Sequence, residues 1–132
     1  MHPRLGDYKT YRLKNHWSTE LTTTADVLTH HSESMAAGDG AAILSDYADD
    51  AILLTPNGAF KGIDQIKAFF DGFMTNLPPD FIKNIELDAT EVEGEYAYIV
   101  WHSGDVSPLG TDTFRIVDGK IVMQSFAAYM PS

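Results

Sequence analysis

The chain has 132 residues, with 9 Lys or Arg against 19 Asp or Glu, so its formal net charge is −10 with histidine neutral. This length favours one domain, and the acidic balance argues against a nucleic-acid partner, because such partners bind basic surfaces. The chain has no cysteine, which excludes disulfides, thiolate nucleophiles and cysteine metal ligands, and no apolar run approaches the ~20 residues of a membrane span.

The basic residues are concentrated at the start of the chain. Four of the nine lie in Arg4–Lys14, so residues 1–20 carry a net charge of +2 and residues 21–132 carry −12. We predict an N-terminal arm over residues 1–22 and a single domain over residues 23–132. The arm lacks the apolar core of a signal peptide, so the expected compartment is the cytoplasm, with no membrane partner. We expect Arg4–Lys14 to fold back on an acidic face of its own or a partner subunit.

The first predicted helix begins at a capping box. Thr23 is followed by Asp26, a spacing at which each side chain can accept a hydrogen bond from the other residue's backbone N–H. Gly38 ends the helix, because glycine tolerates the left-handed conformation found at helix C-termini. Helical spacing predicts that the inward face of this helix carries Leu28, His31 and Met35.

Two further helices are predicted before the chain becomes mainly β. Asp39 can cap a short helix over residues 40–48. A longer helix is predicted over about residues 63–76, where Ile and Phe side chains make a broad apolar face. Pro78 and Pro79 then stop that helix, since proline cannot continue the hydrogen-bond ladder.

The strands are predicted from alternation and turn signals. A first pair, at Ala51–Thr55 and Phe60–Gly62, flanks a turn at Pro56–Gly58. Four more are predicted over residues 81–90, 95–103, 111–117 and 120–129, with a loop over residues 104–110. Asp118-Gly119 between the last two is the strongest short-range hairpin signal in the chain.

This element order predicts an α+β fold, in which a cone-shaped, curved antiparallel (mixed) sheet is wrapped by three helices. The open mouth of such a cone is a frequent small-molecule site. The strand over residues 95–103 is apolar on both faces, with Tyr96 and Tyr98 on one and Ile99 and Trp101 on the other. The pattern does not decide which face lines the pocket. If Ile99 and Trp101 face away, a second subunit is the simplest cover, so we expect a homodimer through the sheet.

Several short segments punctuate the chain at positions typical of one superfamily. They are Ala37-Gly38-Asp39, Tyr47-Ala48-Asp49-Asp50-Ala51, Thr55-Pro56, Gly62-Ile63-Asp64, Phe69-Phe70, Asp112-Thr113-Phe114-Arg115-Ile116 and Asp118-Gly119-Lys120-Ile121. Through them, residues 24–129 resemble the SnoaL-like and ketosteroid-isomerase-like branch of the nuclear-transport-factor-2-like superfamily. The resemblance implies the cone fold. It does not fix the reaction, because the superfamily holds isomerases, polyketide cyclases, dehydratases, epoxide hydrolases and non-catalytic members.

The resemblance also points to three catalytic positions of the ketosteroid isomerases. The chain has His31 where those enzymes have a tyrosine, and Thr55 where they have the general-base aspartate. Asp112 matches the aspartate of the oxyanion hole, a carboxylic acid kept neutral by an apolar site. Steroid isomerisation by the family mechanism is therefore not expected.

Neighbouring positions depart from the family patterns in a similar way. The supporting tyrosine of the family is present as Tyr47, whereas the aromatic hydroxyl usual on the third helix is replaced by Phe70. SnoaL-like cyclases often carry a histidine and an aspartate on the last strand, and the chain has Gln124 and Phe126 in those places.

We predict that Asp112 and His31 are the catalytic residues. Asp112 would donate a proton to a developing oxyanion, and His31, within hydrogen-bond reach of it, would move or orient a proton. The predicted substrate-binding residues are Met35, Tyr47, Thr55, Phe70, Phe73, Tyr98, Gln124 and Phe126. No cofactor and no metal are expected, because the histidines lack the spaced carboxylate motif of a metal site.

Three hypotheses for function remain open. The first is a cofactor-free acid/base enzyme that isomerises, cyclises, eliminates or hydrates a compact apolar substrate bearing a carbonyl or hydroxyl group. The second is a non-catalytic pocket that binds a small hydrophobic molecule with a polar handle. The third is a dimerisation module whose pocket is filled by its own side chains. A cavity that reaches both His31 and Asp112 would keep only the first two.

Overall fold

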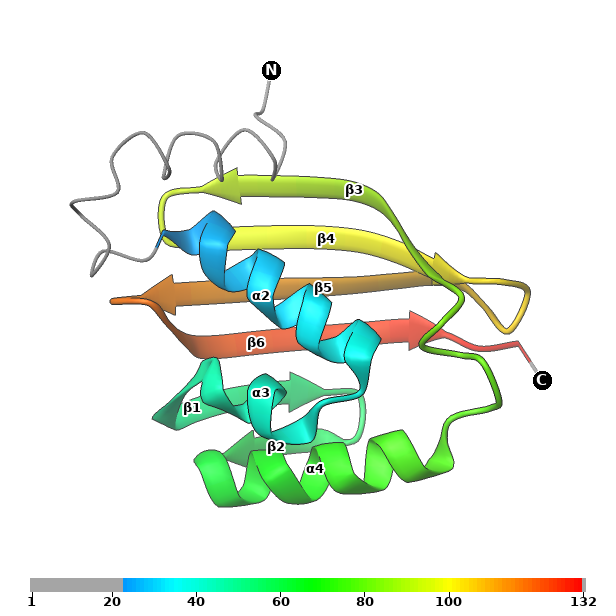
Figure 1. Cartoon of the computed structure of the whole chain (residues 1–132), viewed down its shortest axis with the longest axis horizontal. Helices are drawn as coiled ribbons and strands as arrows, with labels where there is room; N and C mark the ends of the chain where they lie inside the picture. Colours follow the sequence, from blue (N-terminus) through cyan, green and yellow to red (C-terminus); the bar gives the residue numbers. More distant parts are fainter. Residues whose placement is uncertain (1–22, 132) are drawn as a thin grey trace.

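The computed structural model describes residues 23–131, and Figure 1 shows how their helices and strands are arranged. The helices in this range are α2 (Thr24–Ala37), α3 (Gly40–Ser45) and α4 (Ile63–Asn76). The predicted capping box is present, because the Thr23 side chain accepts from the N–H of Asp26 and the Asp26 carboxylate accepts from that of Thr23. Gly38 ends α2 with a φ of 66°, the left-handed conformation that favours glycine.

Six strands form one mixed sheet within the described residues. They are β1 (Tyr47–Thr55), β2 (Gly58–Lys61), β3 (Ile85–Glu93), β4 (Tyr96–Ser103), β5 (Ser107–Val117) and β6 (Lys120–Tyr129). Their order across the sheet is β2-β1-β6-β5-β4-β3. β1 and β6 run parallel, while the other neighbours run antiparallel. The predicted α+β class is therefore confirmed.

The hairpin between β5 and β6 follows its sequence signal. Asp118 and Gly119 both have positive φ, 51° and 77°, as a two-residue turn matched to the twist of its strands requires. Beyond the turn the register shifts between Arg115 and Ile116, and Asp112 then pairs with Phe126 and Phe114 with Gln124. The side chains of these four residues therefore point to the same face of the sheet.

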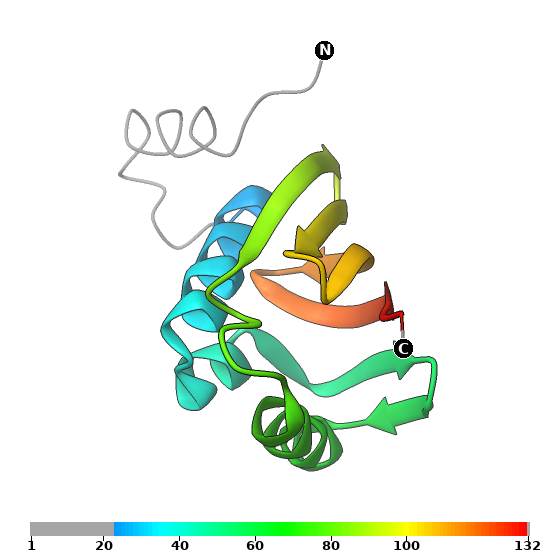
Figure 2. The same cartoon turned by 90° about the vertical axis from the view of Figure 1, so that its right-hand side faces the viewer.

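The helices lie on the inner side of the curved sheet, as the two views in Figures 1 and 2 show. α2 packs against β4 and β5, whereas α4 packs against β1 and β2. The core between these layers is made of buried apolar side chains, among which Leu28, Ile43, Leu53, Ile66, Phe114 and Ile121 are almost completely enclosed. Helices and sheet together form a shell with an apolar interior.

Several element boundaries differ from the prediction. α3 ends at Ser45 instead of residue 48, because Tyr47 already belongs to β1 and pairs with Ile121 of β6. β3 begins at Ile85 instead of residue 81, because turn hydrogen bonds occupy the residues after Pro78. β5 begins at Ser107 within the predicted loop, where it closes the hairpin with β4.

The structure decides which face of β4 points inward. Ala97, Ile99 and Trp101 are buried under the helices. Tyr96 and Tyr98 lie on the outer face and are 53% and 41% exposed. The question that the sequence left open is therefore answered: Ile99 and Trp101 face the interior, and the uncovered face is the one that carries the tyrosines.

Two further predictions from the sequence concern the N-terminal arm and membrane-spanning segments. The arm over residues 1–22, with its predicted contact through Arg4–Lys14, lies outside the described residues. Within the described residues, none of the helices combines the length and the apolar character that crossing a bilayer would require.

Candidate active site

A cavity of about 200 Å³ lies between α2, α4 and the inner face of the sheet. Its wall is mainly aromatic and aliphatic, and it includes Met35, Phe70, Phe73 and Phe126 as predicted. The polar residues on the wall are His31, Ser32, Asp112 and Gln124. The cavity is therefore an apolar space with a few polar groups on its wall, an arrangement typical of small-molecule sites.

Asp112 is held by hydrogen bonds to both of its carboxylate oxygens. Nε1 of Trp101, on β4, donates to Oδ1 at 2.8 Å, and Nε2 of Gln124, on β6, donates to Oδ2 at 2.8 Å. Neither donor can take up a proton under ordinary conditions. Each carboxylate oxygen keeps a second lone pair for a proton or a ligand atom.

The environment of Asp112 favours its protonated form. Burial raises the pKa of Asp112 above its ordinary value of 3.8, and this effect outweighs the hydrogen bonds from Trp101 and Gln124 and the nearby His31, all of which lower it. A carboxyl group with a raised pKa in an apolar cavity can serve as a proton donor, or as a stronger base once it is ionised.

A buried tyrosine fixes the orientation of Gln124. The Tyr47 hydroxyl donates to Oε1 of Gln124, so the amide nitrogen of Gln124 is turned toward Asp112. Burial raises the pKa of Tyr47 well above its usual 10.0, assisted by the negative charges of Asp112 and Asp46. Tyr47 is therefore a permanent donor, and the chain of hydrogen bonds ends at the carboxyl group of Asp112.

Gly110 allows Trp101 to reach Asp112. Gly110 lies opposite Trp101 on β5, two residues before Asp112. A Cβ atom at Gly110 would lie only 2.2 Å from Cε2 of the indole ring. The ring therefore lies directly against the backbone of β5, and its Nε1 is brought to the Asp112 carboxylate.

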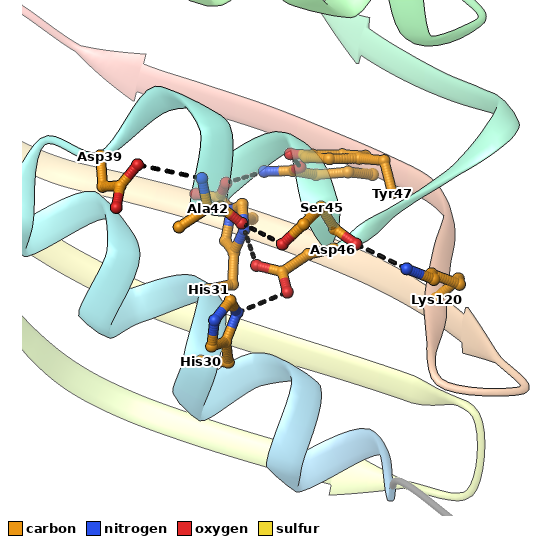
Figure 3. A network of polar contacts seen from close by, with 10 residues as sticks. His30, His31, Asp39, Ala42, Ser45, Asp46, Tyr47 and Lys120 are labelled. Carbon is orange, nitrogen blue, oxygen red and sulfur yellow. Dashed lines mark hydrogen bonds and ion pairs between the residues drawn. The ribbon is translucent and has the colours of Figure 1, made fainter.

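His31 is oriented by a carboxylate other than Asp112. Nδ1 of His31 contacts Oδ2 of Asp46 at 3.3 Å, and Nδ1 of the adjacent His30 contacts Oδ1 at 2.6 Å. Figure 3 shows both rings of α2 reaching the same side chain at the end of α3. The His31 ring also makes edge contacts with Tyr47 and Phe114, at centroid distances of 5.6 and 5.7 Å. These contacts hold His31 on the cavity wall.

The predicted site residues divide into two groups. Those that line the cavity are Met35, Phe70, Phe73, Gln124 and Phe126, together with the two predicted catalytic residues His31 and Asp112. Three others lie elsewhere. Tyr47 is behind the wall, Tyr98 is on the outer face, and Thr55 is in the β1–β2 turn, where its hydroxyl bonds to Asn57 and Gly58. A ligand in the cavity would not touch Tyr98 or Thr55.

Sequence reasoning missed Trp101 and Asp46 as parts of the site. Trp101 was placed on a face that could not be assigned, and only the register opposite Gly110 brings it to Asp112. Asp46 lies 15 residues from His31 in sequence, in the short link between α3 and β1, so no local motif connects the two. His31 and Asp112 face the same cavity and interact electrostatically, but Asp112 bonds to Trp101 and Gln124 rather than to His31.

The described residues contain no group of three or more His, Asp or Glu side chains arranged to hold a metal ion. His102 lies on the outer face of β4. There its Nδ1 contacts Asp88 at 2.8 Å and its Nε2 contacts Glu86 at 3.2 Å. Hydrogen bonding to Asp88 raises the pKa of His102.

Comparison with known proteins identifies the fold and a family. The family model of the SnoaL-like domain matches residues 28–124. No curated protein sequence matches the chain. An NTF2-like protein of unknown function from Burkholderia xenovorans superposes with a TM-score of 0.66 at 21% identity, covering 83% of this chain and 84% of that one.

Two further solved structures carry functional names. One is a candidate polyketide cyclase from Sinorhizobium meliloti, with a TM-score of 0.63 and 17% identity over 76% of this chain and 93% of that one. The other is a candidate ketosteroid isomerase from Kribbella flavida, with a TM-score of 0.64 and 16% identity over 83% of this chain and 82% of that one. At these identities the similarity establishes the fold and not the activity.

Proposed function

Because the chain belongs to the SnoaL-like family, we propose that it is a cofactor-free acid/base enzyme acting on a small apolar molecule with a carbonyl or hydroxyl group. The observation that carries this proposal is the placement of Asp112, a carboxyl group whose pKa is raised by burial, and of the imidazole of His31 on the wall of one apolar cavity. Such a pair can move protons on a bound substrate without a cofactor.

The cavity volume limits the size of the substrate. A cavity of about 150 Å³ lined by apolar side chains is large enough for benzene, so about 200 Å³ suits a monocyclic molecule. The polar residues at the wall include no Lys or Arg, so an anionic substrate would lack a lysine or arginine counter-ion there. A neutral monocyclic ketone or alcohol fits both limits.

The proposed chemistry uses the two groups in complementary roles. Asp112 gives its proton to the substrate oxygen as negative charge develops there, while an imidazole nitrogen of His31 removes a proton from the α-carbon, next to the carbonyl group. Return of a proton from His31 to carbon, and of the oxygen-bound proton to Asp112, completes an isomerisation or an exchange. Elimination uses the same pair with loss of a hydroxyl group as water.

The test is exchange of α-protons in heavy water. A panel of monocyclic ketones, with 3-methylcyclohex-2-enone as the first probe, is incubated with the protein, and deuterium incorporation is followed by mass spectrometry. We expect Asp112→Asn to lower the exchange rate by about 10²- to 10⁴-fold, the usual contribution of general acid–base catalysis, while ligand affinity is retained. His102→Asn is the matched control, since His102 pairs with Asp88 on the outer face.

A non-catalytic binding protein is the second candidate. It is favoured by the apolar cavity wall and by Thr55, which stands where the ketosteroid isomerases have their general base and lies in a turn outside the cavity. Saturable binding of the same ketones, with exchange no faster than in buffer, would establish this alternative. The cavity reaches both His31 and Asp112, which disfavours a module filled by its own side chains.

We also propose a homodimer formed through the outer face of the sheet. Four adjacent strands, β1, β6, β5 and β4, carry exposed apolar side chains on this face, including Ile52, Leu54, Tyr96, Tyr98, Leu109 and Tyr129. An apolar face of this extent favours a self-complementary cover. Sedimentation over a range of concentrations should give twice the chain mass, and Tyr98→Glu should shift it to the monomer. A concentration-independent monomer would contradict the proposal.

A further inference from the structure

Asp46 lies outside the cavity wall but binds a residue on it. Its side chain is 8% exposed, and its two oxygens contact Nδ1 of His30 at 2.6 Å and Nδ1 of His31 at 3.3 Å. The two rings differ in exposure, because the His30 side chain is 50% exposed and that of His31 only 7%. A buried carboxylate thus joins a surface histidine to a cavity histidine.

The chemistry of this contact constrains the His31 ring. An ionised carboxylate only accepts hydrogen bonds, so a ring nitrogen that bonds to it must carry the hydrogen. In a neutral imidazole the other nitrogen then holds a free lone pair. His31 uses Nδ1 for Asp46, and among the described residues its Nε2 has no hydrogen-bond partner. Since the ring lines the cavity, Nε2 is the nitrogen left for a ligand.

We propose that Asp46 is a positioning residue that holds His31 in the tautomer with its proton on Nδ1, leaving Nε2 as the base that faces the cavity. The role of His31 as a base rests on the proposed function, whereas its tautomer rests on the geometry of Asp46. When Nε2 takes a proton from the substrate carbon, the ring becomes a cation. The carboxylate at Nδ1 then stabilises that cation.

A purely structural role for Asp46 is the competing explanation. The two histidine contacts tie α2 to the junction of α3 and β1, and the backbone of Asp46 also accepts a hydrogen bond from Ile121. If these contacts only hold α2 against the junction, the stability of the protein depends on Asp46 but not on the His31 tautomer. The tautomer is therefore the measurement that separates the two roles.

The experiment reads the tautomer directly in the full chain labelled with ¹⁵N. Long-range ¹H–¹⁵N spectra of the histidine rings, recorded where the rings are neutral, distinguish a protonated from an unprotonated ring nitrogen. His31→Gln assigns the His31 signals. We expect wild-type His31 to carry its proton on Nδ1, and Asp46→Ala to move it to Nε2. A wild-type His31 protonated on Nε2 would overturn the proposal even if every variant failed to fold.

The matched control is Asp88→Ala, which removes the carboxylate from Nδ1 of the solvent-facing His102. It should leave the His31 tautomer and the ketone exchange rate unchanged. In Asp46→Ala we expect kcat for exchange to fall by about 10²- to 10⁴-fold with KM little changed. An unchanged tautomer in Asp46→Ala would refute the inference about Asp46. A wild-type protein that exchanges no ketone would refute the proposed function while the tautomer still decides the role of Asp46.

Discussion

Asp112 and Asp46 are two buried carboxyl groups in two regions of the molecule, and each contacts two ring or amide nitrogens. In the sheet, Asp112 receives its bonds from Trp101 and Gln124, which keep their protons. At the junction of α3 and β1, Asp46 contacts two histidines, which can gain or lose theirs. The partners therefore differ in whether they can titrate.

This difference assigns a role to each region. Around Asp112 both neighbours are fixed donors, and burial raises the pKa of the carboxyl group. Around Asp46 the carboxylate contacts two imidazole nitrogens and so orients the rings. The following changes would break one region while leaving the other intact.

The largest expected effect comes from Gly110→Ala, which breaks the Asp112 region. The new Cβ would lie 2.2 Å from the Trp101 ring, so the indole must move away from Asp112. We expect a loss of about 3 kcal/mol in the free energy of unfolding, at the upper end of the usual cost of overpacking. Urea denaturation measures this loss.

Gly72→Ala is the control for the glycine change. Gly72 lies within α4, and a Cβ there would meet nothing within 4 Å. Since glycine is unfavourable inside a helix, Gly72→Ala should stabilise the protein by about 0.5–1 kcal/mol. Equal destabilisation by both changes would show that Gly110→Ala does not act through a clash with the Trp101 ring.

Trp101→Phe breaks the same region more selectively. It keeps an aromatic ring on the cavity wall but removes the N–H that donates to Asp112. Because this hydrogen bond lowers the pKa of Asp112, its removal should raise that pKa further, as followed by NMR titration of the ¹³C-labelled carboxyl group. The unfolding free energy should fall by roughly 1–2 kcal/mol. A lower pKa in the variant would contradict the assignment of Trp101 as donor.

Asp112→Asn sharpens the comparison through pH. Because burial raises the pKa of Asp112, the folded protein binds this proton more tightly than the unfolded chain. Its contribution to stability is therefore fully present below the ordinary value of 3.8 and is lost as the pH rises through the raised folded value. In Asp112→Asn this decline should be absent, so Tm relative to wild type should improve between acid and neutral pH. Parallel Tm curves would contradict the raised pKa.

The smallest effect is expected for His30→Phe, which probes the Asp46 region. The His30 side chain is 50% exposed, and contacts of such partly exposed side chains with a carboxylate contribute about 0–1 kcal/mol. We expect a change in unfolding free energy below about 1 kcal/mol, with the His31 tautomer unaltered because Asp46 remains. A change of tautomer in this variant would mean that His30, and not Asp46, orients His31.

The sequence predicted the elements whose signals are local. The capping box at Thr23, the left-handed Gly38 and the Asp118-Gly119 turn each depend on a few neighbouring residues, and all three are present. The start of β1 at Tyr47 was missed because its partner is Ile121, far along the chain. Pairing between distant strands leaves no mark on local alternation.

Part of the site was predictable from the family resemblance. Asp112, Gln124 and Phe126 line the cavity as the resemblance implied. The hairpin turn alone does not put them on one face, because the register shifts between Arg115 and Ile116. Tyr98 was misplaced because β4 is apolar on both faces, and burial alone separates Ile99 from Tyr98. Asp46 was missed because its link to His31 depends on how α3 packs beside α2, which no sequence period encodes.

The strand order also sets when the site can form. β6 lies between β1 and β5 in the sheet although it follows both in the chain. Until β6 pairs, Tyr47 and Asp112 belong to two separate pieces of sheet, and Gln124 is not yet there to connect them. Pairing β6 with β1 closes a loop that contains α4 and the strands β2 to β5, and forming contacts so distant in sequence is slow. A folding intermediate in which β3, β4 and β5 are paired would therefore carry Trp101 and Asp112 but no finished cavity.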